Sequence, residues 1–528
     1  MKFYALFLCS LFFVSKAKIK VLNENSFEES SFFTTWATAV YETEPPKMKL
    51  TNNSLRQIVH VSTSGENVRL KFSNKNGKTN LEIKEVTIAD SLTQGTGEID
   101  LKTLITLYFQ KEKNIILSPG EEVYSDIISY NLKPLSDIAI SIYFGETPEN
   151  LTGHPKSRTY SFIEEGNKIY NKTISKENKI DHWYIISALE VSSNPRKKTI
   201  VCFGDSITDG TGTTMDRQNR WPDLLSSKLH LNKETNNIAV VNKGIGGDKI
   251  TTQGLARFSN DALEVKGVSH IIVLYGINDI NDLNSTSSEI ILVYKKLIEK
   301  AHKNNIFIYA GTILPEGNYG KWSEEKEKCR KEVNYWIKNT KKEDGGFDAS
   351  FDFDELIRDP DNHSKIFSLY DCGDGLHPNE EGYQRMIQAI NNLDIFTLEP
   401  NFNKSDLNEI NLFDKIGIKF ELNFKLEKEE EIIINIKGRS DGSNGFRVLT
   451  TNNEGIKTSD YYYTGKILEG KFWIINIKLK VYDSSNYIVI KRPLSTINID
   501  NIILEYIEVS SEKNKKIFNL GEEGSFLD

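Results

Sequence analysis

The sequence at residues 199–206 reads TIVCFGDS, an apolar run that ends in a Gly-Asp-Ser turn. An apolar run without alternation is typical of a strand buried on both faces of a parallel sheet. Downstream, similar runs alternate with segments of helical spacing. We expect strands over 238–241, 270–275, 306–310 and 349–353, and helices over 221–229, 255–263, 288–303, 324–339 and 380–392. This alternation predicts an α/β domain with a doubly wound parallel sheet, whose ligand site lies beyond the carboxyl ends of the strands.

Both flanks of this domain have the two-residue period of antiparallel strands. On the N-terminal side, residues 56–62 and 67–73 alternate polar with apolar side chains, and residues 64–66 predict a hairpin loop between them. On the C-terminal side we expect strands over 416–426, 431–437, 472–480, 487–491 and 497–509. The sequence therefore predicts an N-terminal β-sandwich (18–192), the α/β domain (193–397) and a C-terminal β-sandwich (398–528).

The composition excludes several classes of protein. The chain has 528 residues, with 66 Lys and Arg against 74 Asp and Glu, a formal net charge of −8. This acidic balance argues against a nucleic-acid partner, because nucleic-acid binders usually carry a basic stripe. No apolar run of about 20 residues follows the N-terminus, so we expect no membrane-spanning helix in the mature protein. Four cysteines are too few for a disulfide framework or a Cys-rich zinc fold.

The first 17 residues have the pattern of a secretory signal peptide. Lys2 supplies a positive charge, residues 3–14 are almost wholly apolar, and Ser15 and Ala17 are small residues suited to a cleavage site. A buried N-terminal strand is the alternative. Signal cleavage after Ala17 predicts a secreted, extracellular protein. It would leave three cysteines, Cys202, Cys329 and Cys372, whose pairing the sequence leaves open.

Two segments carry the residue types of nucleophilic catalysis. Ser206 follows the first strand of the α/β domain directly, so its hydroxyl is expected at the top of the sheet. A serine becomes a useful nucleophile only when a base removes its proton. His377 supplies such a base, and Asp374, three residues before it on the same tight loop, can orient the imidazole. Taken singly, each residue also fits a purely structural role. Ser206 could belong to a capping turn, and His377 could be a packed histidine held beside a capping Asp.

Two further strand ends offer hydrogen-bond donors. The segment 241–248 contains Gly247, whose backbone N–H can approach a ligand oxygen closely. Asn278, after the third strand, carries a side-chain amide that can donate to a developing oxyanion. A mobile turn and a helix cap are the corresponding structural alternatives.

Together, the four segments resemble the GDSL or SGNH hydrolase family, whose second name records the Ser, Gly, Asn and His of its sequence blocks. All four residues occur here in the family order, over about residues 197–395. The resemblance implies a flavodoxin-like SGNH fold in which Ser206 is the nucleophile, His377 the general base and then acid, and Asp374 its orienting group. It also implies an oxyanion hole made by the backbone N–H groups of Ser206 and Gly247 and by the Asn278 amide. It implies no cofactor and no metal, and no His/Cys/Glu cluster has metal-ligand spacing.

Weaker likenesses at residues 35–39, 55–60 and 208–223 resemble one branch of secreted esterases with an N-terminal β-sandwich. Many members of that branch are associated with removing acetyl groups from plant cell-wall polysaccharide. Cys372 departs from the small residue expected at its position. From the resemblance to this branch we expect an acylated polysaccharide or oligosaccharide as the partner, with no nucleic acid and no membrane. The C-terminal sandwich is a candidate carbohydrate-binding module, in which residues 461–463 could stack on sugars or fill a hairpin, and Trp473 is expected in the core.

Alternative functions remain open at the level of sequence. A lipase or general carboxylester hydrolase would use the same residues but would need an apolar groove for the acyl chain. A non-catalytic glycan-binding protein would bind glycan through its β modules and keep the hydrolase fold without its activity. A glycosidase built on Asp205 and Asp209 is disfavoured, because two residues that flank one turn do not face each other across a cleft.

Overall fold

The computed structural model describes residues 32–192 and 197–400, together with the strand backbones between residues 410 and 527. The chain forms two compact units that divide between Pro400 and Asn401. The predicted signal peptide lies outside the described residues. Among the residues that are described, no helix combines the length and apolar character needed to cross a bilayer.

The N-terminal part of the first unit is an antiparallel β-sandwich, as predicted. One sheet has the order β1-β16-β4-β10, with β9 beside β4, and the other has the order β14-β13-β3-β11-β5-β6, with β7 and β8 beside β5. A small third sheet contains β15, β12 and β2. The strands are β1 (Phe32–Ala37), β2 (Tyr41–Thr43), β3 (Asn53–Val61), β4 (Gly65–Ser73), β5 (Leu81–Thr93), β6 (Glu98–Ile99), β7 (Ile105–Leu107), β8 (Ile115–Leu117), β9 (Glu122–Tyr124), β10 (Ile128–Leu132), β11 (Ser136–Phe144), β12 (Leu151–Pro155), β13 (Ser161–Glu165), β14 (Lys179–Ile180), β15 (His182–Tyr184) and β16 (Ile186–Ser192).

The predicted hairpin at residues 64–66 is wrong. Strand β3 pairs with β11 and β13, whereas β4 pairs with β16, β10 and β9, so the two strands belong to different sheets. The connection between them is held to β1 instead, because Ser62 donates both its N–H and its Oγ to the Thr35 carbonyl, and the Thr63 N–H donates to Thr35 Oγ1. The alternation correctly marked two half-buried strands but could not show that they face each other across the core.

The second part of the first unit is a doubly wound α/β domain. Its five parallel strands have the order β18-β17-β19-β20-β21, which is the flavodoxin-like order 2-1-3-4-5. They are β17 (Thr199–Gly204), β18 (Ala239–Gly244), β19 (Val268–Leu274), β20 (Phe307–Gly311) and β21 (Ala349–Phe351). The chain reverses direction across the sheet between β17 and β19, so their carboxyl ends form the switch point where ligands bind in such folds.

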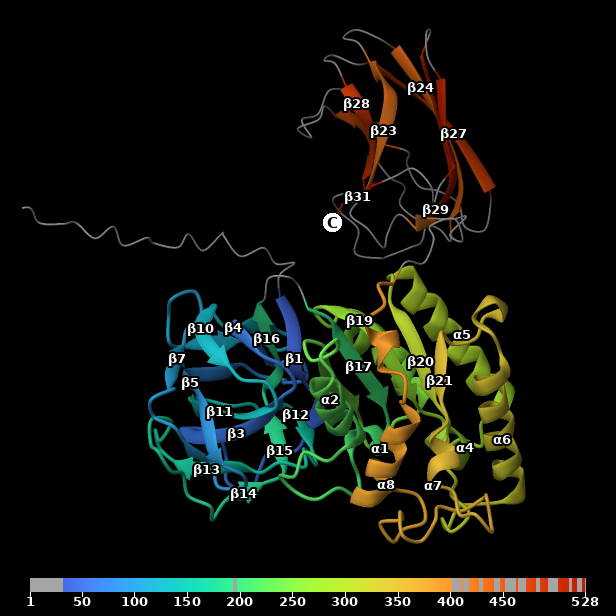
Figure 1. Cartoon of the computed structure of the whole chain (residues 1–528). Helices are drawn as coiled ribbons and strands as arrows, with labels where there is room; N and C mark the ends of the chain where they lie inside the picture. The colour runs from blue at the N-terminus through green and yellow to red at the C-terminus, as the bar shows by residue number, and fades with distance from the viewer. Residues whose placement is uncertain are drawn as a thin grey trace, which may run out of the picture. The chain divides into compact units, whose positions relative to one another are not determined.

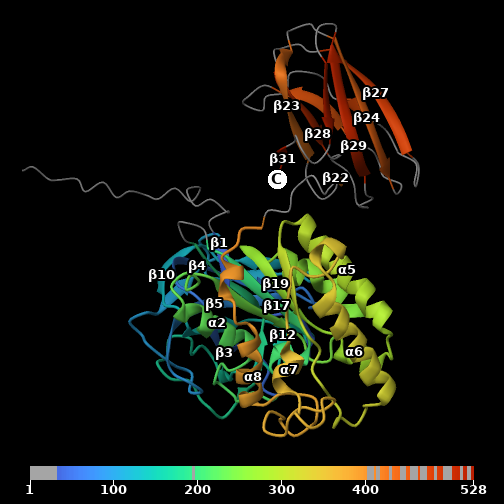
Figure 2. The same ribbon diagram turned by 45° about the vertical axis from the view of Figure 1, so that its right-hand side comes forward.

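Helices cover both faces of this sheet (Figures 1 and 2). Helix α2 (Trp221–Leu231) contacts α8 (Glu380–Met386), whereas α5 (Ser287–Lys303) contacts α6 (Glu324–Asn339). The expected helix over 255–263 begins earlier, as a π-helix at Ile250–Gly254, continues as α3 (Leu255–Phe258) and ends in a second π-helical turn, Ser259–Leu263. The earlier start follows from the Asp279 carboxylate, which accepts hydrogen bonds from the N–H groups of Ile250 and Thr251.

The last predicted helix is shorter than expected. Helix α8 gives way to a 3₁₀ turn at Ile387–Ala389. The carbonyls of Ile387 and Ile390 there accept hydrogen bonds from Lys228 Nζ of helix α2, which compete with continued helical bonding. Shorter elements, α1 (Ser206–Asp209), α4 (Ile277–Asp282) and α7 (Phe353–Ile357), follow the carboxyl ends of strands.

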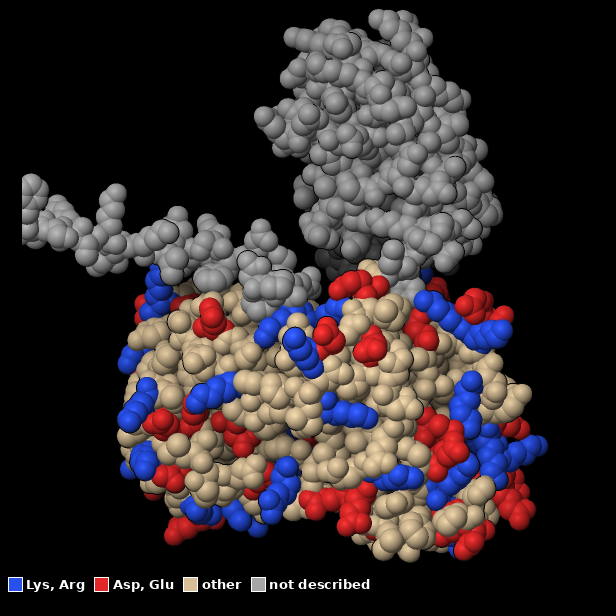
Figure 3. Space-filling view, viewed as in Figure 1, with Lys and Arg blue, Asp and Glu red and all other residues tan. Residues whose placement is uncertain are grey.

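The sandwich and the α/β domain lie side by side in both ribbon views, with strand β1 in contact with β18. Each part contributes residues to the apolar core of the other. Ala37 and Ala188 of the sandwich belong to the core of the α/β domain, and Ala239 of the α/β domain belongs to the core of the sandwich. On the face shown in Figure 3, basic and acidic side chains of the described residues are interspersed rather than separated into patches.

The second unit contains antiparallel strands in two sheets, in agreement with the predicted β-sandwich. One has the order β22-β29-β24-β27, with β30 beside β29, and the other has the order β26-β25-β28-β23-β31. The strands are β22 (Ile410–Asn411), β23 (Gly417–Leu426), β24 (Glu431–Ser440), β25 (Arg447–Thr451), β26 (Tyr462–Tyr463), β27 (Phe472–Lys480), β28 (Ser485–Lys491), β29 (Ile502–Ser511), β30 (Lys515–Asn519) and β31 (Ser525–Leu527). The predictions about residues 461–463 and Trp473 concern side chains outside the described part of the chain.

Candidate active site

Ser206 is the first residue of α1 and follows strand β17 after a sharp turn. The Asp205 carboxylate caps the helix by accepting a hydrogen bond from the Ile207 N–H at 3.0 Å. The turn needs glycine at position 204, because a Cβ there would lie 1.9 Å from Thr208 Oγ1 and 2.8 Å from the Leu274 carbonyl oxygen. The sequence therefore places Ser206 at the carboxyl end of β17, the first strand of the domain in chain order.

The structure brings Ser206, His377 and Asp374 into one hydrogen-bonded chain. Ser206 Oγ lies 2.8 Å from His377 Nε2, and His377 Nδ1 lies 2.7 Å from Asp374 Oδ2. A carboxylate accepts hydrogen bonds, so Nδ1 carries the proton donated to Asp374. Nε2 is then the nitrogen free to accept the proton of the Ser206 hydroxyl, which is the arrangement required of a general base.

The Asp374 carboxylate is held by its own loop. Its Oδ1 accepts hydrogen bonds from the backbone N–H groups of Leu376 and His377, each at 2.9 Å. Partial burial acts to raise the pKa of Asp374, but the hydrogen bonds from the His377 side chain and from these N–H groups outweigh it and lower the pKa below its ordinary value. The group therefore remains an anion that can fix the orientation of the imidazole.

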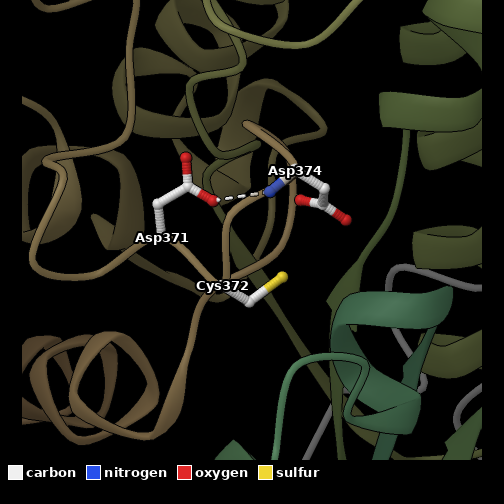
Figure 4. Close-up of side chains that lie close together, drawn as sticks. All are labelled: Asp371, Cys372 and Asp374. Carbon is white, nitrogen blue, oxygen red and sulfur yellow. Dashed lines mark hydrogen bonds between the residues drawn. The ribbon is translucent and has the colours of Figure 1, made fainter.

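Asp371 shapes the turn that precedes His377 (Figure 4). Its Oδ1 accepts hydrogen bonds from the N–H groups of Gly373 at 2.7 Å, Asp374 at 3.2 Å and Gly375 at 3.1 Å. Figure 4 draws the bond to Asp374. Asp371, Cys372 and Asp374 offer ligand atoms within 4.8 Å of one another, but both carboxylates accept hydrogen bonds from their own loop. Burial, followed by the charge of Asp374, raises the pKa of the Cys372 thiol to about 11. The thiol beside the loop is therefore predominantly protonated at neutral pH.

The two candidate oxyanion donors follow the strands on either side of β17. Gly247, after β18, is exposed and has a φ of +76°, with open space where a Cβ would stand. Asn278 lies in the first turn of α4, after β19, and its Nδ2 donates to the Asp248 carbonyl oxygen at 3.0 Å. One N–H of that amide remains for another acceptor. The Asn278 side chain is thereby tied to the turn that contains Gly247.

A buried network behind these turns was missed by sequence reasoning. Arg257 donates from Nη2 to the carbonyls of Gly204, at 3.0 Å, and Lys243, at 2.9 Å, and from Nε to Asp248 Oδ2 at 2.6 Å. Tyr275 OH donates to the same Asp248 oxygen at 2.7 Å. Arg257 thus links the ends of β17 and β18 to the turn that contains Gly247 and Asp248. The signal available in the sequence was Asp248, a carboxylate that directly follows the glycine turn after a strand.

Asp205 is one of several buried acids in this region, with Asp248 and Asp279. Burial, and then the negative charges of Asp248 and Asp279, raise the pKa of Asp205 to about 8, against the lowering effect of the Ile207 N–H and Arg257. Its side chain faces neither a partner carboxylate across a cleft nor open solvent. This burial agrees with the sequence argument against a glycosidase pair.

A sequence profile of the GDSL-like lipase/acylhydrolase family matches residues 202–385. This segment is a GDSL-like lipase/acylhydrolase domain. The match begins within β17 and ends within α8, so it contains Ser206, Gly247, Asn278, Asp374 and His377. The family prediction made from the four sequence blocks is therefore confirmed for this domain.

Solved structures similar to the chain overlap it over little more than a third of its length. They include a member of the lipolytic protein G-D-S-L family from Veillonella parvula DSM 2008 (23% identity, TM-score 0.30), with 38% of this chain and 98% of that chain covered. A lipase/acylhydrolase from Enterococcus faecalis has 20% identity and a TM-score of 0.31, with 39% and 98% covered. An acetyl xylan esterase, AlAXEase, has 21% identity and a TM-score of 0.29, with 36% and 97% covered. A comparison with curated proteins found no match.

Proposed function

We propose that this protein is a secreted serine esterase that removes acetyl and other short acyl groups from a polysaccharide. Membership of the GDSL-like lipase/acylhydrolase family makes the domain a carboxylic ester hydrolase. The observation that carries the proposal is the hydrogen-bonded chain from Ser206 Oγ through His377 to Asp374. Secretion is supported by the pattern of residues 1–17.

The reaction follows from the positions of these groups. His377 Nε2 removes the Ser206 proton as Oγ attacks the ester carbonyl carbon, and a tetrahedral oxyanion forms. The Ser206 and Gly247 N–H groups and the Asn278 amide are the proposed donors to that oxyanion, and loss of one such donor raises the barrier by about 2.7–4 kcal/mol. The bond to the alcohol breaks, and His377 gives the proton to the departing oxygen. Water, deprotonated by His377, then releases the acyl group as a carboxylic acid.

The openness of the site supports a polymeric substrate with a small acyl group. Gly246, Gly247, Cys372 and Gly373 are exposed, and 44% of the Asp374 side chain remains accessible. A polysaccharide chain can reach a nucleophile on such a surface without threading into a tunnel, and an acetyl group needs no long apolar groove. The weaker likeness to esterases with an N-terminal β-sandwich points to the same substrate class.

The proposal is tested by Ser206→Ala, with acetate release measured on a panel of acetylated plant cell-wall polysaccharides. We expect kcat to fall by at least about 10³-fold while thermal unfolding is unchanged. Ser269→Ala is a matched control, because Ser269 Oγ also lies 2.7 Å from a histidine nitrogen, Nδ1 of His270, but in strand β19 away from the site. Wild-type turnover by Ser206→Ala would disprove the mechanism.

The acyl preference needs a separate measurement. On 4-nitrophenyl esters from acetyl to octanoyl, an acetylesterase is expected to lose kcat/KM as the chain lengthens. A rise with chain length would instead favour the lipase alternative.

A further inference from the structure

His154 of the N-terminal sandwich is bonded to the helix that bears Ser206. It lies in β12, is 2% exposed, and its Nε2 lies 2.8 Å from Oδ1 of Asp209, the last residue of α1. Its Nδ1 lies 2.7 Å from the Ala39 carbonyl oxygen. The imidazole is thus held from both ring nitrogens, by a backbone carbonyl on one side and by the carboxylate of α1 on the other.

The sandwich also holds the segment that follows α1. Arg158 Nη2 donates to Thr211 Oγ1 at 3.0 Å. The Asp216 carboxylate accepts from the Tyr160 N–H at 2.9 Å, and the Asp216 N–H donates to the Arg158 carbonyl at 2.9 Å. Residues 209–216 are thus fastened to the loop between β12 and β13 at several points, through both side chains and backbone.

The same segment contacts the loop and helix that carry and follow His377. Tyr383 OH of α8 donates to the Thr211 carbonyl at 2.7 Å. Gly212 passes so close that a Cβ there would lie 2.2 Å from the Pro378 carbonyl oxygen, and its φ of +91° favours glycine. Just beyond this segment, Asn219 Nδ2 donates to the Glu380 carboxylate. One segment therefore touches the sandwich on one side and the histidine loop on the other.

We propose that the N-terminal sandwich is part of the catalytic unit, with His154 as a positioning residue that sets the Ser206–His377 geometry through Asp209. The inference rests on the proposed function, because it takes Ser206 as the nucleophile. Helix α1 has only four residues, so its own hydrogen bonds give it little rigidity. A displacement of about 1 Å between reacting groups can lower a rate about 10²-fold, so a buried contact that fixes the position of this helix affects turnover.

The test compares His154→Ala with His154→Gln in the full chain, using 4-nitrophenyl acetate. We expect His154→Ala to lower kcat about tenfold to hundredfold, with KM changed by less than about threefold. Glutamine keeps an N–H that can donate to Asp209, so His154→Gln should recover most of the lost kcat.

The control is His302→Ala, which removes another His–Asp pair (2.9 Å to Asp348 Oδ2) at the amino ends of the strands, opposite the site. We expect it to destabilise the fold but to keep kcat near the wild-type value. A kcat for His154→Ala equal to that of His302→Ala would overturn the proposal.

If His154→Ala does not fold, Thr211→Val decides the question. This near-isosteric change removes only the Arg158 hydrogen bond, and a kcat at least about threefold lower at unchanged thermal stability is expected. An unchanged kcat would overturn the proposal. Activity retained by Ser206→Ala would refute the proposed function itself, whereas an inactive Ser206→Ala with unaffected His154 and Thr211 variants would refute only the positioning role.

Discussion

In the proposed mechanism, the reactivity of Ser206 depends on the groups around it rather than on its own chemistry. A serine hydroxyl is a weak nucleophile at neutral pH, and the imidazole that contacts it must present an unprotonated nitrogen. Asp374 enforces this tautomer by accepting the Nδ1 proton, and the N–H groups of its own loop keep it anionic. Asp374 and His377 lie on the same short loop, so only the contact between this loop and Ser206 depends on tertiary structure.

Asp205 provides a prediction about pH. Its folded-state pKa, raised to about 8, lies above the ordinary carboxyl value, so the folded protein holds a proton there that the unfolded chain releases at lower pH. This protonation contributes stability that is fully present below the ordinary carboxyl pKa and is lost as the pH rises towards and through about 8. We expect Asp205→Asn, which mimics the protonated form, to lose less thermal stability than the wild type between pH 5 and pH 9.

The measurement is the unfolding temperature of both proteins across that range. Asp354→Asn is a control, because it alters a carboxylate that is paired with Arg330. Parallel curves for the wild type and Asp205→Asn would contradict the prediction.

At the scale of elements, the site is built by the carboxyl ends of β17, β18 and β19. Ser206 follows β17, Gly247 follows β18 and Asn278 follows β19, and these three strands are adjacent in the sheet. A flavodoxin-like strand order places this site at the switch point between β17 and β19. Arg257 connects the strand ends, because one guanidinium reaches two of their carbonyls and the Asp248 carboxylate.

Arg257→Lys tests that connection. Lysine keeps the charge but lacks the planar fork, so it cannot bond both carbonyls and Asp248 together. We expect the unfolding free energy to fall by roughly 1–3 kcal/mol and kcat to fall about tenfold or more. Arg330→Lys is a control, since the buried Arg330 likewise bonds two carboxylates and a backbone carbonyl, those of Glu327, Asp354 and Ile313. If both variants retain kcat equally, Arg257 has only a structural role.

At the scale of the whole molecule, the N-terminal sandwich and the GDSL-like domain form one compact unit, and residues from 401 onward form another. The first two share core residues and the His154–Asp209 pair. We expect a chain ending at Pro400 to keep its kcat on 4-nitrophenyl acetate within about twofold, because separate compact units fold independently.

Removing the sandwich should have the opposite result. A chain of residues 197–528 is expected to lose folding and turnover, since it would expose the buried surface now covered by β1 and β16. Circular dichroism and steady-state kinetics measure both truncations. An active, folded 197–528 chain, or an inactive chain ending at Pro400, would contradict this division.

The sequence alone determined the fold class and the candidate catalytic residues. Apolar runs and helical spacing report which face of each element is buried, and Ser206, Asp374 and His377 stand in short local patterns. Periodicity does not identify the element that packs on each buried face, because it depends on one segment of the chain alone. Only the tertiary structure placed β3 and β4 in different sheets, started the 250–263 helix at the Asp279 cap and brought Arg257 to the turn that contains Gly247 and Asp248. Likewise, His154 and Asp209 lie 55 residues apart in different modules, and their contact depends on how two folded cores pack together.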